Sequence, residues 1–184
     1  CAIGNAYPTF EEGRKYLAPG LFGPCGYGLP SIIGAKIACR DVPVVGFAGD
    51  GAFGIAVTEL TAIGRNEWPP VTMVVFRNYQ WGAEKRNSTL WYDDNFVGTE
   101  LDPEVSYAGI AKACGLQGVV ARTQDELRDA LAKAVEDQMK HGKTTLIEAM
   151  INQELGEPFR RDAMKKPVEV AGISASDMRP QVLA

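Results

Sequence analysis

One stretch of the chain, residues 44–82, constrains the fold more than any other. The apolar run at residues 42–48, where it begins, has the length of a buried parallel strand. The next three residues, Gly49-Asp50-Gly51, predict a tight turn directly after that strand. The stretch therefore begins as a strand whose end carries a carboxylate between two glycines.

The rest of this stretch predicts a helix and a second strand. Apolar residues recur at helical spacing after the turn, and the prolines at 69 and 70 end the helix. Residues 71–76 form a second apolar run, and Asn78 follows it. Polar residues thus stand at the exits of two strands, which is the edge where open parallel sheets bind ligands. The predicted inward face of the helix comprises Phe53, Ala56, Val57, Leu60 and Ile63.

The residue types at the two strand exits suit a metal-bound diphosphate. The glycines allow backbone N–H groups to approach an anion, and the following helix N-terminus adds a favourable dipole. Asp50 would repel a bare phosphate, so a cation must lie between the two. Mg²⁺ is commonly shared between a carboxylate and phosphates, and Asn78 offers a second oxygen ligand.

Two other interpretations of the turn stay open. Residues 49–54 also spell G-x-G-x-x-G after a strand, which is a dinucleotide fingerprint. The next strand ends in Arg77-Asn78, however, and offers no acidic ligand for a ribose. A purely structural turn would explain the glycines but would leave Asp50 and Asn78 as coincidence.

Length and composition indicate an ordinary globular domain. The 184 residues suffice for one domain with a sizeable core, with 46% hydrophobic and 23% charged residues. The net charge of −4 implies no nucleic-acid partner and no membrane surface. The four cysteines are scattered without a C-x-x-C pair, so we expect reduced thiols and a cytoplasmic location. Because the chain opens at Cys1 without an initiator Met, we expect a piece of a longer polypeptide.

The remaining pattern alternates strands and helices. Helices are predicted at residues 31–39, at 102–115 and after a capping box at 123–126, with further strands at 118–121 and 144–151. His141, the one histidine, is expected at a helix C-terminus. The inward face of the long helix is predicted to comprise Leu127, Leu131, Ala134, Val135 and Met139. The fold class is therefore α/β, a doubly wound and mostly parallel sheet with helices on both faces.

The G-D-G motif and the spacer that ends in Asn78 resemble the signature of thiamine-diphosphate enzymes. The resemblance implies the thiamine-diphosphate-binding fold, with thiamine diphosphate and Mg²⁺ as cofactors. It implies metal ligation by Asp50, by Asn78 and by the backbone carbonyl of Gln80. The glycine-rich segment at 23–30 is similar to the family stretch whose first Gly and Met contact the aminopyrimidine, with Cys25 in place of that Met. The expected cofactor-binding residues are Gly23, Cys25, Gly49, Asp50, Gly51, Ala52, Asn78, Gln80, Trp81 and Gly82.

Within that superfamily, residues 78–87, 142–148 and 154–167 are similar to the sulfoacetaldehyde acetyltransferases. The resemblance implies that sulfoacetaldehyde and phosphate give acetyl phosphate and sulfite. Two alternatives stay open: an enzyme similar to acetolactate synthase or sulfopyruvate decarboxylase, and a non-catalytic cofactor-binding module. Candidates for binding the substrate anions are Arg160, Arg161, Lys85 and Arg86, with a solvated basic face as the alternative.

The expected organisation is a diphosphate-binding domain at residues 1–151 and a tail at 152–184 that is basic in its first half. The resemblance implies a pyrimidine-binding domain and a middle domain, neither of which this chain resembles. The activating Glu of the family lies on the pyrimidine-binding domain of the same or a partner subunit. We therefore expect a homo-oligomer, and we expect this chain alone to be inactive.

Overall fold

The computed structural model describes residues 8–11, 13, 15–20 and 22–154. The chain divides into two compact units. The first contains Cys1–Tyr79 and Asp102–Asn152, and the second contains Gln80–Leu101 and Gln153–Ala184. No helix among the described residues is both long and apolar enough to cross a membrane.

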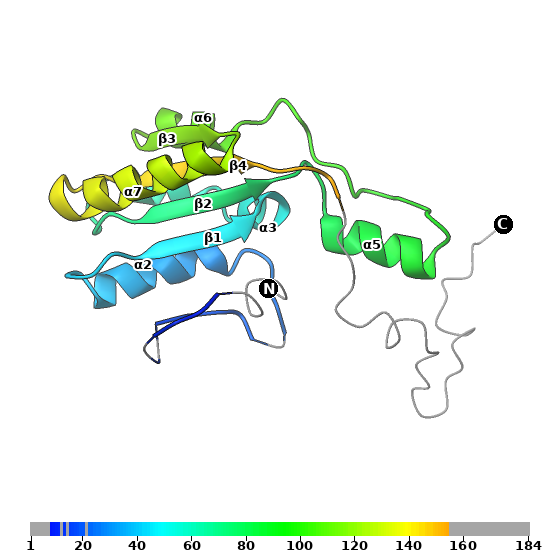
Figure 1. The fold of residues 1–184 in the computed structure, drawn as a ribbon, viewed down its shortest axis with the longest axis horizontal. Helices are drawn as coiled ribbons and strands as arrows, with labels where there is room; N and C mark the ends of the chain where they lie inside the picture. The colour runs from blue at the N-terminus through cyan, green and yellow to red at the C-terminus, as the bar shows by residue number, and fades with distance from the viewer. Residues whose placement is uncertain (1–7, 12, 14, 21, 155–184) are drawn as a thin grey trace. The chain divides into compact units, whose positions relative to one another are not determined.

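The first unit is built on a four-stranded parallel sheet (Figure 1). Its strands are β1 (Val45–Gly49), β2 (Thr72–Arg77), β3 (Gln117–Ala121) and β4 (Thr145–Met150), arranged in the order β1-β2-β4-β3. Gly49 at the end of β1 pairs with Phe76 of β2. Because the strands are parallel and in this register, residues 50 and 77–79 leave the sheet at the same edge.

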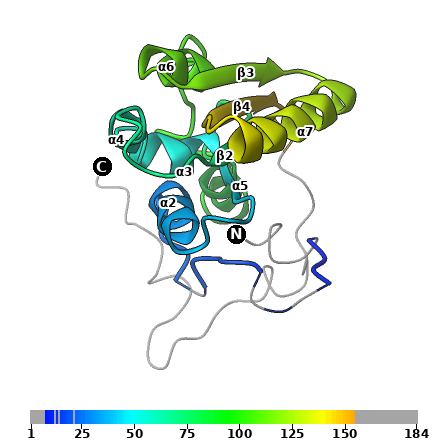
Figure 2. The same cartoon turned by 90° about the vertical axis from the view of Figure 1, so that its left-hand side faces the viewer.

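Helices cover both faces of this sheet, as predicted (Figure 2). One face packs against α2 (Gly28–Ala38), α3 (Asp50–Ile55), α4 (Glu59–Ile63) and α6 (Tyr107–Ala113) around a core that includes Leu60, Val75 and Leu146. The other face packs against α7 (Gln124–Lys140) around a smaller core that includes Val74 and Ile147. The alternation of these β2 and β4 side chains between the two cores follows from the two-residue period of a strand.

The helix predicted after the turn is continuous in the sequence pattern but divided in the structure. Phe53, Leu60 and Ile63 reach the core as expected, yet α3 ends at Ile55 and α4 starts only at Glu59. Gly54 lies against α6, where an added Cβ would meet the Tyr107 hydroxyl at 2.8 Å. Glycine disfavours a continuous helix, and two β-branched residues follow it at 57–58.

The start of α7 is as predicted, but its inward face is partly different. The Thr123 side chain accepts a hydrogen bond from the Glu126 N–H, so the helix begins at the expected cap. Met139 is 40% exposed, whereas its neighbour Gln138 is buried. Gln138 bonds both backbone groups of Val44 and the Thr72 hydroxyl, which explains why a polar residue faces the sheet there.

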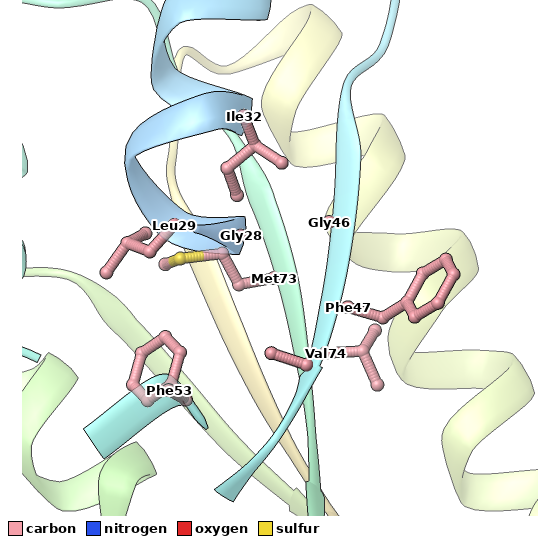
Figure 3. A pocket seen from close by; sticks show the side chains of 9 residues that line it. Gly28, Leu29, Ile32, Gly46, Phe47, Phe53, Met73 and Val74 are labelled. Carbon is pink, nitrogen blue, oxygen red and sulfur yellow. The ribbon is translucent and has the colours of Figure 1, made fainter. Parts of the chain in front are cut away.

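A small apolar cavity lies between α2 and β1 in the first unit (Figure 3). It holds about 10 Å³, near the lower limit for one water molecule. An added Cβ at Gly46 would lie 2.5 Å from Ile32, so glycine lets the helix approach the strand here. The nine residues that line the cavity are all uncharged, which makes it a gap in the packing.

The second unit contains a helix for which the sequence pattern gave no prediction. This helix, α5 (Gly82–Trp91), has no buried residue among those described. The Trp81 N–H donates to the Thr99 carbonyl at 2.7 Å, and Gln80 forms an isolated bridge with Glu100. These contacts hold the two ends of the 80–101 segment to each other.

Candidate metal and diphosphate site

The carboxylate of Asp50 is the centre of the candidate site. Asp50 is the first residue of α3 and is only 1% exposed. Its Oδ2 atom accepts hydrogen bonds from Arg77 Nη1 at 3.1 Å, from the Asn78 N–H at 3.1 Å and from the Tyr79 N–H at 2.7 Å. Its Oδ1 atom accepts one from the Gly51 N–H at 2.9 Å. The structure thus joins the two strand exits through one carboxylate.

Arg77 is the closest charged neighbour of this carboxylate, and it too is 1% exposed. Its Nη2 atom donates to the carbonyls of Asp102 at 2.6 Å and Val105 at 3.0 Å. The guanidinium carbon lies 4.3 Å from the ring centre of Tyr79 and 5.1 Å from that of Tyr107. Aromatic faces and carbonyl oxygens both favour a guanidinium, so this side chain is held on several sides.

Glu148 on β4 provides a second buried carboxylate at the same guanidinium. Its Oε1 atom lies 3.5 Å from Arg77 Nε, which is an ion pair without hydrogen-bond geometry. Its Oε2 atom accepts hydrogen bonds from the Ser106 hydroxyl at 2.9 Å and the Ala108 N–H at 3.1 Å. One arginine therefore stands between two carboxylates, and the formal charges of the three side chains sum to −1.

Tyr107 closes the cluster on the side of α6. Its hydroxyl donates to the backbone carbonyl of Asp50 at 2.9 Å. Burial raises the pKa of this hydroxyl, Arg77 acts in the opposite direction, and the carboxylates of Asp50 and Glu148 raise it further. The hydroxyl thus stays protonated over a wider pH range than usual and keeps donating to the backbone at residue 50.

The donor set fits a Mg²⁺ ion that is shared with phosphates. Mg²⁺ prefers oxygen ligands and is usually held by one or two carboxylates together with substrate phosphates and water. No group of three or more His, Cys, Asp or Glu side chains occurs in the described part of the chain, so an all-protein acidic cage is not offered there. Asp50 supplies a carboxylate at the sheet edge, and Asn78, whose backbone N–H bonds that carboxylate, follows β2 at the same edge.

The other predicted cofactor residues fall into three groups. Gly49, Gly51 and Ala52 are in the turn and the start of α3, next to Asp50. In the segment before α2, Gly23 has a positive φ of 57° and Cys25 is exposed. The second unit contains the remaining three, which are Gln80, Trp81 and Gly82.

The candidate anion-binding residues are only partly described. Lys85 pairs with Glu100 and lies 5.3 Å from the ring centre of Phe96, within the second unit. Arg86 is half-buried in α5. Arg160 and Arg161 lie outside the described residues.

Sequence reasoning missed Arg77 and Glu148 as parts of the site. A signal for both was present, because each is a charged residue in an otherwise apolar strand. Charged residues are almost never fully buried unless they are paired. Each of these charges therefore indicated a buried and paired side chain, but the pattern did not say which residue its partner would be.

Comparison with known proteins identifies the class to which this fold and site belong. Residues 2–149 match the family described as "Thiamine pyrophosphate enzyme, C-terminal TPP binding domain". The chain belongs to that family, whose cofactor is thiamine diphosphate. A solved structure of benzoylformate decarboxylase from Polynucleobacter necessarius aligns with 74% of this chain and 25% of its own, with a TM-score of 0.62 and 28% identity.

Two curated relatives differ widely in their similarity to the chain. Sulfoacetaldehyde acetyltransferase of Roseovarius nubinhibens is 83% identical over 98% of this chain and 30% of its own length. The catalytic subunit of mitochondrial acetolactate synthase from Saccharomyces cerevisiae is 30% identical over 69% of this chain and 18% of its own length. The chain thus spans about a third or less of the length of either relative.

Proposed function

We propose that this chain is the diphosphate-binding domain of an enzyme that converts sulfoacetaldehyde and phosphate to acetyl phosphate and sulfite. The observation that supports this most is the 83% identity to a sulfoacetaldehyde acetyltransferase along nearly the whole chain. The acetolactate synthase relative is far less similar, so that alternative is weaker. Residues 1–151 would form the diphosphate-binding domain and residues 152–184 a tail.

In this proposal Asp50 and Asn78 hold Mg²⁺ against the diphosphate, and the Gln80 carbonyl is a further ligand. Asp50 provides the negative charge, and its four hydrogen-bond donors fix where that charge lies. Thiamine diphosphate, when bound, supplies the electron sink for cleavage beside the aldehyde carbon. Gly23 and Cys25 would contact the aminopyrimidine through their backbone.

A pyrimidine-binding domain of the same or a partner subunit would complete the site and provide the activating Glu. An exposed apolar surface near the glycine-rich segment supports this arrangement. Phe22 is 92% exposed and Ile55 is 59% exposed, and Ile55 lies beside Gly26. Exposed apolar surface of this kind favours a protein partner. We further propose a homo-oligomer in the cytoplasm, where the free thiols of Cys25, Cys39 and Cys114 would remain reduced.

The test is a product assay with the complete enzyme, thiamine diphosphate and Mg²⁺. We expect sulfoacetaldehyde and phosphate to yield sulfite and acetyl phosphate in equal amounts. Acetolactate from pyruvate without sulfite release would instead favour the acetolactate synthase alternative. No turnover of any of these substrates, with the pyrimidine-binding domain present, would favour a non-catalytic module.

A further inference from the structure

The contacts around Arg77 match the geometry of an arginine side chain. Its guanidinium faces two carboxylates, donates to two carbonyls and lies against two tyrosine rings. An arginine presents five donors in a rigid plane, whereas a lysine presents a compact point charge on a flexible stem. A lysine here would keep the charge but could not reach these partners together.

The contacts of Arg77 fix the carboxylate at residue 50 from outside the proposed metal site. Its Nη1 atom bonds Asp50 Oδ2, the same atom that receives the N–H groups of Asn78 and Tyr79. Glu148 is in turn held by Ser106 and Ala108 at the start of α6. The start of α6 therefore holds Glu148, Glu148 pairs with Arg77, and Arg77 bonds Asp50.

The backbone beside Asn78 depends on the same pair. Tyr79 has a φ of 61°, a left-handed conformation that is rare for a bulky residue. Such a residue persists only where its surroundings over-determine it. Here its N–H bonds Asp50 and its ring lies on the Arg77 guanidinium, so the pair also holds the turn that follows Asn78.

We propose that Arg77 is a positioning residue for the proposed metal site: it holds the Asp50 carboxylate and the turn at Asn78 in the arrangement that binds Mg²⁺ and the diphosphate. This inference rests on the proposed assignment of Asp50 and Asn78 as metal ligands. In this proposal Arg77 acts through Asp50 and Tyr79 and is not itself a ligand of the metal. Arg77 strengthens Mg²⁺ binding by orienting the ligands, and this gain exceeds the repulsion between its positive charge and the cation.

The experiment compares Arg77→Lys and Arg77→Met in the complete enzyme. Thiamine diphosphate is titrated by calorimetry with and without Mg²⁺, and kcat is measured at saturating cofactor. Loss of a group that orients a metal ligand typically lowers affinity by about 10–100-fold. We expect both variants to lose Mg²⁺-dependent affinity by about that factor, while kcat at saturation stays within about threefold of wild type.

A matched control separates positioning from general destabilisation. Gln138→Leu also removes a buried polar side chain, but at the opposite end of β2, about 17 Å along the strand from Arg77. This variant should melt at a lower temperature with unchanged cofactor affinity. Wild-type cofactor affinity in Arg77→Lys would overturn the inference and leave Arg77 with a structural role only. Tighter cofactor binding in Arg77→Met would also overturn it, because the charge of Arg77 would then only repel the cation.

A third variant shows whether a negative result refutes only the positioning role of Arg77 or the proposed metal site itself. Asp50→Asn should lose Mg²⁺-dependent binding altogether. If Asp50→Asn binds normally, the proposed metal site is wrong and the role of Arg77 is refuted with it. If only Asp50→Asn is impaired, the metal site stands and the positioning role is refuted.

Discussion

Replacing Glu148 by leucine tests how strongly the buried charges depend on one another. The substitution removes the carboxylate that faces Arg77 and takes the hydrogen-bond acceptor away from the Ser106 hydroxyl and the Ala108 N–H. Breaking a buried ion pair by removing one partner costs about 3–5 kcal/mol. Because Arg77 keeps Asp50 and two carbonyls, we expect the lower end, about 3 kcal/mol.

Amide hydrogen exchange measures this cost locally in the complete enzyme without cofactor. A loss of about 3 kcal/mol should make exchange in β2 and β4 roughly 100-fold faster, since each 1.4 kcal/mol is a factor of ten. The control is Glu148→Gln, which keeps an oxygen acceptor and loses only the charge, so exchange should rise about tenfold. Wild-type exchange in Glu148→Gln would refute the contribution of the charge, and exchange in Glu148→Leu that is no faster than in Glu148→Gln would refute the contribution of the lost acceptor.

Two further changes test the fold away from the site. A hydrogen bond from Lys133 lowers the pKa of the Asp137 carboxyl below its ordinary value of 3.8 in the folded protein. The ionised carboxylate therefore stabilises the fold fully above pH 3.8, and this stabilisation is lost as pH falls through the lower folded-state pKa. Asp137→Asn should therefore be less stable than wild type in urea unfolding at pH 7 and equally stable below that folded-state pKa; a constant difference at all pH values would contradict this. In Gly118→Ala the new Cβ would lie 2.1 Å from the Ala108 carbonyl oxygen, so α6 must shift away from β3 at a cost of about 1–3 kcal/mol. An unchanged melting temperature would show that this approach is not tight.

Much of the fold could be predicted because the spacing of apolar residues and the positions of turn-forming and capping residues indicate the same helices and strands. The apolar runs around Gly49 and before Asn78 became β1 and β2, and Thr123 begins α7 as its capping pattern indicates. The division between α3 and α4 was missed although Gly54 and the β-branched residues at 57–58 disfavour a continuous helix, whereas the close contact of Gly54 with Tyr107, more than fifty positions further along the chain, could not be predicted from local patterns. The burial of Gln138 likewise depends on tertiary partners at Val44 and Thr72.

The candidate site could be predicted only in part, for a related reason. Asp50 and Asn78 stand at strand ends, and parallel strands bring such ends together whatever the rest of the chain does. The roles of Arg77 and Glu148 depend on the order of strands, because β4 inserts beside β2 and places both side chains on one face. Strand order is a long-range property that local patterns do not specify.

The most direct measurement is a calorimetric titration of thiamine diphosphate into the Asp50→Asn form of the complete enzyme, with and without Mg²⁺. Asparagine keeps the shape of the side chain but removes its charge and one of its two acceptor oxygens, so binding at wild-type affinity would show that the carboxylate is not needed. We predict that Mg²⁺-dependent binding is lost in Asp50→Asn and is weakened but still measurable in Asn78→Ala. Wild-type affinity in Asp50→Asn, in the presence of Mg²⁺, would contradict the assignment of Asp50 as the charged ligand that holds the cofactor in this domain.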